Sequence, residues 1–191
     1  MLQFVKVIQL FKNETQLISR AGNNNREAQR LLYEKYSGKM LSVCRIYIKD
    51  IHHAEEVMLT GFFKVFTHLK DFKNEGSFEG WIRKIMVRES ISFLRIQKDM
   101  EFRDEMIEDG RDSFNSVQEE IDAEHIQQII DGLPEGYRVV FVLYAIEGYK
   151  HHEIAEMLNI TTGTSKSQLF KARKMLQERL EKQNIAEYGT K

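Results

Sequence analysis

Residues 148–180, GYKHHEIAEMLNITTGTSKSQLFKARKMLQERL, predict two helices joined by a tight turn. We expect the first helix over 150–158 and the second over 162–183. Thr161 or Thr162 can cap the second helix, because a threonine hydroxyl accepts a hydrogen bond from an early helical N–H. The stretch is therefore typical of a helix-turn-helix.

The second of these helices has two faces of different chemistry. Ser165, Leu169, Ala172 and Leu176 follow helical spacing, so we expect this stripe to pack against the first helix. The opposite side carries cations, small polar residues and one phenylalanine, which suit phosphate and base contacts in a DNA groove. A solvated surface helix with ordinary charges is the alternative. The residues predicted to contact DNA here are Thr164, Lys166, Ser167, Phe170, Lys171, Arg173 and Lys174.

Composition predicts an all-α fold with two small helical domains. The 191 residues are 42% hydrophobic and include one proline, so long helices meet few breakers. The net charge of −1 excludes a uniformly basic nucleic-acid binder, but residues 99–124 are strongly acidic and their flanks are more basic. We therefore expect a first domain over 1–98, an acidic linker over 99–124 and a second domain over 125–191.

Helical periodicity and turn residues give the expected elements. Pro134 suits a first-turn position, where its missing N–H costs nothing. Glycine and asparagine at 22–25 and 74–76 mark the sharpest turns. The expected helices cover 13–21, 26–49, 52–72, 77–98, 117–132, 134–147, 150–158 and 162–183.

A second pattern related to nucleic-acid binding lies in the helix expected over 77–98. Phe78, Ile82 and Ile85 share one side, while an aromatic residue and a row of polar and basic residues share another. Aromatic rings can stack on unpaired bases while cations follow the phosphates, which predicts a surface for single strands. The alternative is that the tryptophan belongs to the core. The second side comprises Trp81, Lys84, Arg88, Ser92 and Arg95.

The remaining patterns argue against catalysis, metal binding and a membrane span. The one cysteine, Cys44, cannot form an internal disulfide, which fits a cytoplasmic protein, and its apolar helix predicts a core residue rather than a reactive thiol. The histidine pairs at 52–53 and 151–152 are adjacent, so each pair points to different faces of a helix. No apolar run approaches the ~20 residues of a span, and the start at 1–14 is not read as a signal peptide. We expect no enzyme, catalytic residue, metal, cofactor or small-molecule substrate.

Four segments in this order resemble the bacterial sigma-70 family of RNA polymerase sigma factors, in its extracytoplasmic-function (ECF) group. LISRAGNNNREAQRLLYEKY at 17–36 is similar to the start of the promoter-melting domain. AEEVMLTGFFKVF at 54–66 is similar to the helix that docks on the polymerase clamp. FEGWIRKIMVRESISFLR at 78–95 resembles the promoter-melting helix. Residues 133–176 resemble the domain that binds the upstream promoter element.

The resemblance implies a sigma factor that binds core RNA polymerase, at the beta-prime clamp and beta flap, and directs promoter-specific initiation. It implies that the helix-turn-helix domain contacts the minus-thirty-five element of promoter DNA and that the acidic linker threads into polymerase. It also allows for an anti-sigma factor as a partner. The residues expected to contact core polymerase are Glu55, Glu56, Leu59, Thr60 and Phe63. The residues expected to contact the minus-ten element are Lys73, Asn74, Ser77, Phe78, Trp81, Lys84, Arg88 and Arg95.

The sequence departs from the family pattern at a few positions. Leu59 and Thr60 stand where glutamine and an acidic residue are usual, and Glu89 places a carboxylate on a helix expected to meet DNA. Ser165 replaces a usual valine and Gln168 a frequent arginine, which we expect to weaken the packing and phosphate contacts of the second helix slightly. A helix-turn-helix regulator that acts without polymerase and a protein-binding helical module remain as alternatives.

Overall fold

The structure is a computed structural model that describes residues 14–101 and 123–188. The chain divides into two compact units, residues 1–93 (unit 1) and 94–191 (unit 2). All secondary structure within the described ranges is helical, which confirms the all-α prediction. The predicted linker lies mostly outside the described residues, so the predicted domain bounds at 98 and 125 stay a prediction.

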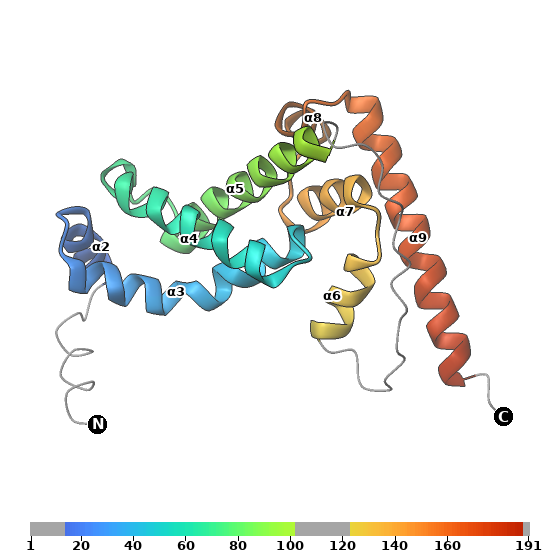
Figure 1. Cartoon of the computed structure of the whole chain (residues 1–191), viewed down its shortest axis with the longest axis horizontal. Helices are drawn as coiled ribbons and strands as arrows, with labels where there is room; N and C mark the ends of the chain where they lie inside the picture. The colour runs from blue at the N-terminus through green and yellow to red at the C-terminus, as the bar shows by residue number, and fades with distance from the viewer. Residues whose placement is uncertain (1–13, 102–122, 189–191) are drawn as a thin grey trace. The chain divides into compact units, whose positions relative to one another are not determined.

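Unit 1 is built on the long helix α3, which packs against both α2 and α4 (Figure 1). Side chains cap two of its helices: Asn25 accepts a hydrogen bond from the Ala28 N–H, and Asp50 accepts one from the His53 N–H. The elements are α2 (Glu14–Gly22), α3 (Arg26–Tyr47), α4 (Ile51–Thr67), a 3₁₀ turn η1 (Leu69–Asp71) and the part of α5 (Phe78–Glu101) up to residue 93.

The helix predicted over 52–72 ends earlier than expected. Helix α4 stops at Thr67, and the chain continues into η1. The Thr67 hydroxyl donates to the Phe63 carbonyl at 3.0 Å, and His68 Nδ1 lies 3.0 Å from the Lys64 carbonyl. These side chains add hydrogen bonds to carbonyls of the last turn at the exposed end of the helix.

Large apolar side chains fill the core of unit 1, and α4 meets α5 at close range. A Cβ atom on Gly61 would lie only 2.3 Å from Met86 Sδ, so glycine at 61 permits this approach. Cys44 is completely buried, which confirms its predicted core position, and burial raises the pKa of its thiol to about 11. The largest fully buried side chains of this unit are Leu32, Met40, Tyr47, Val65, Ile82, Met86 and Val87.

Unit 2 packs its shorter helices against one long helix, α9. The helix expected over 134–147 begins as an α-helix but ends in a π-helical turn, where the Glu147 N–H bonds to the Val142 carbonyl at 3.0 Å. The elements are α6 (Ala123–Asp131), α7 (Glu135–Phe141), the π turn η2 (Val142–Ile146), α8 (His151–Leu158) and α9 (Thr162–Tyr188).

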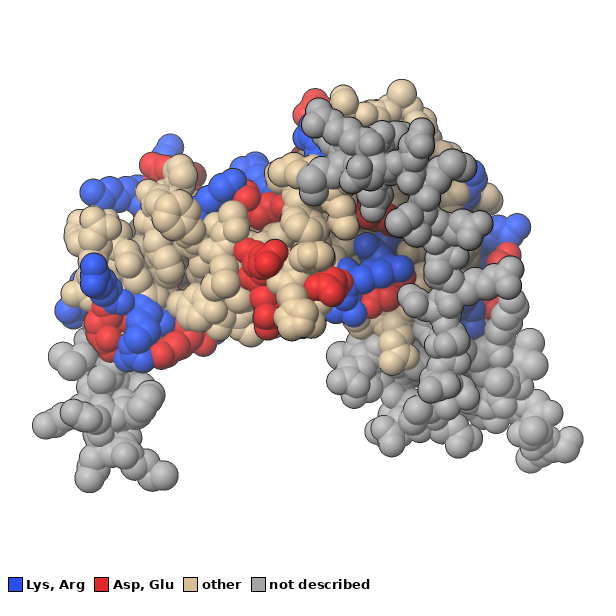
Figure 2. All heavy atoms as spheres, in the orientation of Figure 1, with Lys and Arg blue, Asp and Glu red and all other residues tan. Residues whose placement is uncertain are grey.

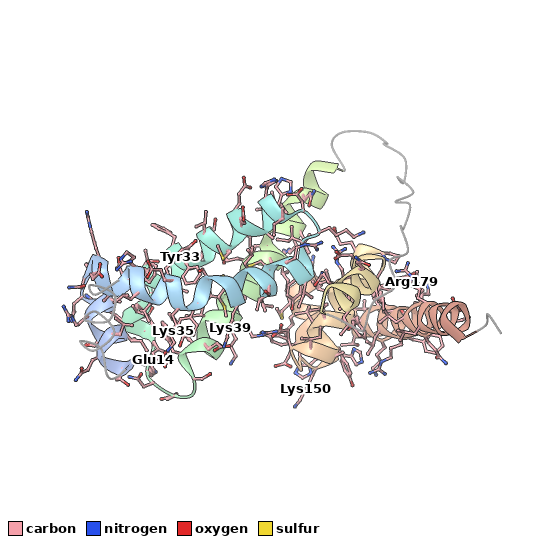
Figure 3. The ribbon with its side chains drawn as sticks, turned by 90° about the horizontal axis from the view of Figure 1, so that it is seen from below. Glu14, Tyr33, Lys35, Lys39, Lys150 and Arg179 are labelled. Carbon is pink, nitrogen blue, oxygen red and sulfur yellow. The ribbon has the colours of Figure 1, made fainter. Side chains whose placement is uncertain are left out.

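Arg179 of α9 forms hydrogen bonds with the C-terminal end of α6. Its guanidinium donates to the Ile129 carbonyl at 3.2 Å and to the Gly132 carbonyl. Arg179 is labelled on α9 in Figure 3. A cation at a helix C-terminus also interacts favourably with the helix dipole. A Cβ atom on Gly132 would overlap the Arg179 guanidinium, so any other residue here would require this flexible side chain to shift.

Candidate nucleic-acid interface

Helices α8 and α9 form the predicted helix-turn-helix. The turn between them passes through Asn159, whose φ of 53° lies in the left-handed region that asparagine tolerates. The Thr164 N–H donates to the Thr161 hydroxyl at 3.0 Å, so Thr161 rather than Thr162 caps α9. Glu153 caps α8 by accepting the Lys150 N–H at 2.7 Å.

Three of the four residues in the stripe predicted to pack against α8 are buried, and the fourth, Leu176, is half-buried. Ser165, Leu169 and Ala172 are all inaccessible or nearly so, and Ile154 of α8 is fully buried. The expectation that Ser165 weakens this packing stays a prediction, but the buried serine is not left without a partner. Its hydroxyl lies 2.9 Å from Nδ1 of His151, so the buried polar group has a hydrogen-bond partner. This hydrogen bond offsets part of the cost of burying a hydroxyl at a position where valine is usual.

The opposite face of α9 is exposed and basic. Phe170 is 71% exposed, an unusual degree for a phenylalanine, and cations surround it in the sequence. Thr164 is half-buried, and the Ser167 hydroxyl donates to its carbonyl at 3.0 Å. The other residues predicted to contact DNA on this helix are exposed, namely Lys166, Lys171, Arg173 and Lys174.

Two of the exposed cations on α9 lie over aromatic rings of unit 2. Lys171 Nζ is 5.8 Å from the centre of the Tyr137 ring, and the Arg173 guanidinium carbon is 5.5 Å from the centre of the Tyr144 ring. Both distances are within the range of cation–π attraction. The neighbouring rings therefore influence where these charges sit on the helix surface.

The start of α5 presents a different surface from that of α9. Phe78, predicted to contact DNA, is only 3% exposed, so the structure corrects that assignment. Its ring packs edge-on against Tyr36, 5.6 Å away, and Phe72, 5.1 Å away. Trp81 is half-buried and stacks on Phe78 at 5.8 Å, so it belongs partly to the core and partly to the surface.

The turn before α5 exposes three of the residues predicted to contact the minus-ten element. Lys73, Asn74 and Ser77 are exposed, and Asn74 has a φ of 59°. The Ser77 hydroxyl accepts the Gly80 N–H at 3.1 Å and so caps α5. Part of the hydrogen-bonding capacity of this serine is already used by the helix end.

Further along α5, the predicted cations are exposed while the unexpected carboxylate is not. Lys84, Arg88 and Arg95 are all exposed. The side chain of Glu89 is 12% exposed and binds Lys64 of α4 at 2.7 Å. The Glu89 carboxylate, which we expected on the side that meets DNA, is therefore turned toward α4 and paired with Lys64. On the face of unit 1 visible in Figure 2, acidic and basic atoms are interspersed.

Helix α4 exposes apolar side chains beside polar ones. Leu59 is 53% exposed and Phe63 is 69% exposed, one helical turn apart. Glu55, Glu56 and Thr60 are exposed next to them, and the Thr60 hydroxyl donates to the Glu56 carbonyl at 2.9 Å. Neighbouring exposed apolar side chains with polar residues around them are typical of a protein-binding surface. The five residues predicted to contact polymerase are thus all accessible.

Sequence reasoning missed the contacts that connect distant segments. The pair Lys64–Glu89 spans 25 residues, and the bond between His151 and Ser165 spans 14. Glu14 and Lys35 are labelled in Figure 3. Glu14 binds Lys35 and the Tyr36 hydroxyl, 21 and 22 residues away, and these bonds lower the pKa of Glu14. The departures at Glu89 and Ser165 were the available signals, because a polar residue at a packed position needs a partner.

Two regions of the chain match models of one protein family. The model described as Sigma-70 region 2 matches residues 32–99, and the model described as Sigma-70, region 4 matches residues 123–176. The chain belongs to the sigma-70 family. The region 2 match contains the α4 and α5 surfaces, and the region 4 match contains the helix-turn-helix.

Curated relatives resemble this sigma factor over most of its length. It is 24% identical to the RNA polymerase sigma-H factor of Pseudomonas aeruginosa, over 89% of this chain and 95% of that protein. It is 27% identical to the ECF RNA polymerase sigma factor SigW of Bacillus subtilis, over 76% of this chain and 84% of that protein. These likenesses support its place in the ECF group.

A solved structure shares the fold. The sigma factor RpoE of Bartonella quintana, crystallised with the anti-sigma factor NepR, matches with a TM-score of 0.53 and 17% identity. The match covers 80% of this sigma factor and 96% of that chain. Among the residues that the structure describes, no helix is long and apolar enough to cross a membrane. In the same residues, no three His, Cys, Asp or Glu side chains are grouped as a metal site.

Proposed function

We propose that this sigma factor binds core RNA polymerase and directs promoter-specific transcription initiation, with unit 1 at the minus-ten element and unit 2 at the minus-thirty-five element. The observation that carries the proposal is the presence, in one chain, of an exposed apolar surface on α4 and exposed cationic surfaces on α5 and α9. A regulator that bound DNA alone would need no such surface on α4. The role of this sigma factor would be to recognise promoters in the cytoplasm rather than to catalyse a reaction.

Helix α9 would read the duplex. Its buried stripe faces α8, so the outward side, with Phe170 and the cations, is free to enter a major groove. The lysines would contact phosphates, which position the helix, while Phe170 would contact a base edge such as a thymine methyl. The other residues we assign to the minus-thirty-five element are Thr164, Lys166, Ser167, Lys171, Arg173 and Lys174.

Helix α5 and the turn before it would hold separated strands. Lys84, Arg88 and Arg95 are spaced so that they share one exposed side of the helix. Trp81 offers a half-exposed ring for stacking, backed by Phe78 in the core. The exposed turn at 73–77 would accept a base displaced from the duplex, a step that costs a few kcal/mol and needs contacts to offset it. Phe78 supports this site from behind and does not touch the strand.

Helix α4 would carry the contact with core polymerase. Burying Leu59 and Phe63 against the clamp removes apolar area from water, about 25 cal/mol per Å². Glu55, Glu56 and Thr60 would form the polar edge of that contact. A second contact at the beta flap and a partner anti-sigma factor are part of the proposal, the latter because RpoE of Bartonella quintana is in complex with NepR.

Run-off transcription with core polymerase tests the proposal. Core enzyme with this chain should initiate at defined start sites on a promoter library, whereas core enzyme alone should not. Leu59→Asp with Phe63→Asp should abolish initiation, since the charges would be buried on docking. Ile126→Asp, at an exposed apolar residue of α6, is the matched control. A parental chain that binds duplex DNA but never redirects core enzyme would instead support an independent regulator.

A further inference from the structure

Four side chains of unit 2 form a continuous series of contacts. The Tyr144 ring stacks on the His151 ring, with centroids 4.7 Å apart and planes inclined by 25°. His151 Nδ1 lies 2.9 Å from the buried hydroxyl of Ser165. The Tyr144 ring also lies under the Arg173 guanidinium, at 5.5 Å. The series therefore joins η2 to α8 and joins both to the DNA-facing helix α9.

The π turn that carries Tyr144 is anchored in the core of unit 2. Val142 and Leu143, the two residues before Tyr144, are both completely buried. The Glu147 N–H bonds to Val142 and the Tyr149 N–H bonds to Leu143, at 3.0 and 2.9 Å. Single π turns are found disproportionately at functional sites. Because the two residues before it are held in the core, Tyr144 offers Arg173 an aromatic surface that is anchored on one side.

The charges around His151 agree with this arrangement. The pKa of His151 is lowered, first because the ring is partly buried and then because Lys166 and Arg173 lie nearby. A neutral imidazole can stack on Tyr144 and share a hydrogen bond with Ser165 without repelling Arg173. The cation of this series is thus Arg173, whose side chain is exposed on α9.

We propose that Tyr144 is a positioning residue for DNA recognition: it holds Arg173 in a preset orientation for contact with the upstream promoter element. The hydrogen bond between His151 and Ser165 fixes the position of the stacked His151 and Tyr144 rings relative to α9. An arginine ordered before binding loses less conformational freedom when it meets DNA. This inference rests on the proposed function of α9 and explains how the orientation of Arg173, one of its DNA-contacting residues, is determined.

A double-mutant cycle on the holoenzyme tests the inference. The probe is a duplex promoter that parental holoenzyme selects from a library randomised over the upstream element. Tyr144→Leu should weaken binding about two- to five-fold, the size expected of an exposed cation–π contact, whereas Tyr144→Phe should bind like the parent because it keeps the ring. In an Arg173→Ala background, Tyr144→Leu should have no further effect.

Two results would overturn the inference. One is a loss with Tyr144→Leu that is equally large with and without Arg173, which would make Tyr144 a packing residue only. The other is a loss with Tyr144→Phe as large as that with Tyr144→Leu. Thermal unfolding checks each variant, and Tyr144→Met takes the place of Tyr144→Leu if the latter does not fold. Failure of the proposed function looks different, because parental holoenzyme would then select no promoter.

Discussion

Helices α5 and α9 were both predicted to face DNA, yet the structure leaves them with very different surfaces. On α9, the stripe with helical spacing is buried except for the half-buried Leu176, and the predicted contact residues lie outside it. On α5, Phe78 is in the core, Trp81 is half-buried and Glu89 is paired with Lys64 of α4. A helix that packs along one stripe leaves its opposite side exposed, whereas a helix with neighbours on several sides has less exposed surface. A phenylalanine is therefore a core residue on α5, at Phe78, and a surface residue on α9, at Phe170.

The two phenylalanines sharpen this difference most. Phe78→Ala should lower the free energy of unfolding of unit 1 by about 3–5 kcal/mol, because it empties a packed site between Tyr36, Phe72 and Trp81. Phe170→Ala should change stability by less than about 0.5 kcal/mol, because the ring is exposed. Denaturant unfolding followed by circular dichroism measures both. Equal losses would contradict the contrast between the two helices.

An ion pair on each helix gives a second comparison. Lys64→Met should cost about 1 kcal/mol or more, because it leaves the largely buried Glu89 carboxylate without its cation. Lys174→Met removes an exposed pair with Glu178 at 3.9 Å and should change stability by less than about 0.5 kcal/mol. Adding Glu89→Met to Lys64→Met should recover part of the loss. If Lys64→Met costs nothing, then Glu89 is stable without its partner.

The smallest effect concerns pH and unit 2. The folded-state pKa of His151 lies below its ordinary value of about 6.5, so protons bind the unfolded chain more readily. The free energy of unfolding should therefore be highest above that ordinary value and should fall as the pH drops toward the folded-state pKa. His151→Gln should flatten this dependence, while His152→Gln, at the exposed neighbouring position, should leave it in place. A slope that is identical in all three proteins would refute the assignment to His151.

Local chemistry predicted most of the helices. The Thr161 cap, the turn residues at 22–25 and the apolar stripe of α9 act over a few residues, so their pattern is visible in the sequence. The early end of α4 at Thr67 and the π turn at 142–146 were missed, and the π turn lies where Val142 and Leu143 are buried in the core of unit 2.

The candidate site could be predicted where exposure follows from one helix alone. The cations and Phe170 of α9 are such a case. The burial of Phe78 depends on Tyr36, 42 positions earlier in the chain, and the pairing of Glu89 depends on Lys64. Contacts at such separations leave no periodic signal. A polar residue on a packed side, such as Glu89 or Ser165, indicates that a partner exists but does not identify it.

The most direct test compares the cations of the two helices in promoter opening. Permanganate footprinting of the promoter bubble measures opening, and a gel assay measures binding to core polymerase. Lys84→Ala with Arg88→Ala should bind core normally and form the closed complex almost as well as the parent, but open a duplex promoter poorly.

Lys171→Ala with Lys174→Ala should instead weaken the closed complex and reduce its salt dependence by about two units, one for each lysine that no longer neutralises a phosphate. Once bound, that variant should open the promoter at the parental rate. The account predicts these opposite patterns. If the α5 variant opens duplex and premelted promoters equally well at parental rates, then α5 is a structural helix and the division of labour between α5 and α9 is wrong.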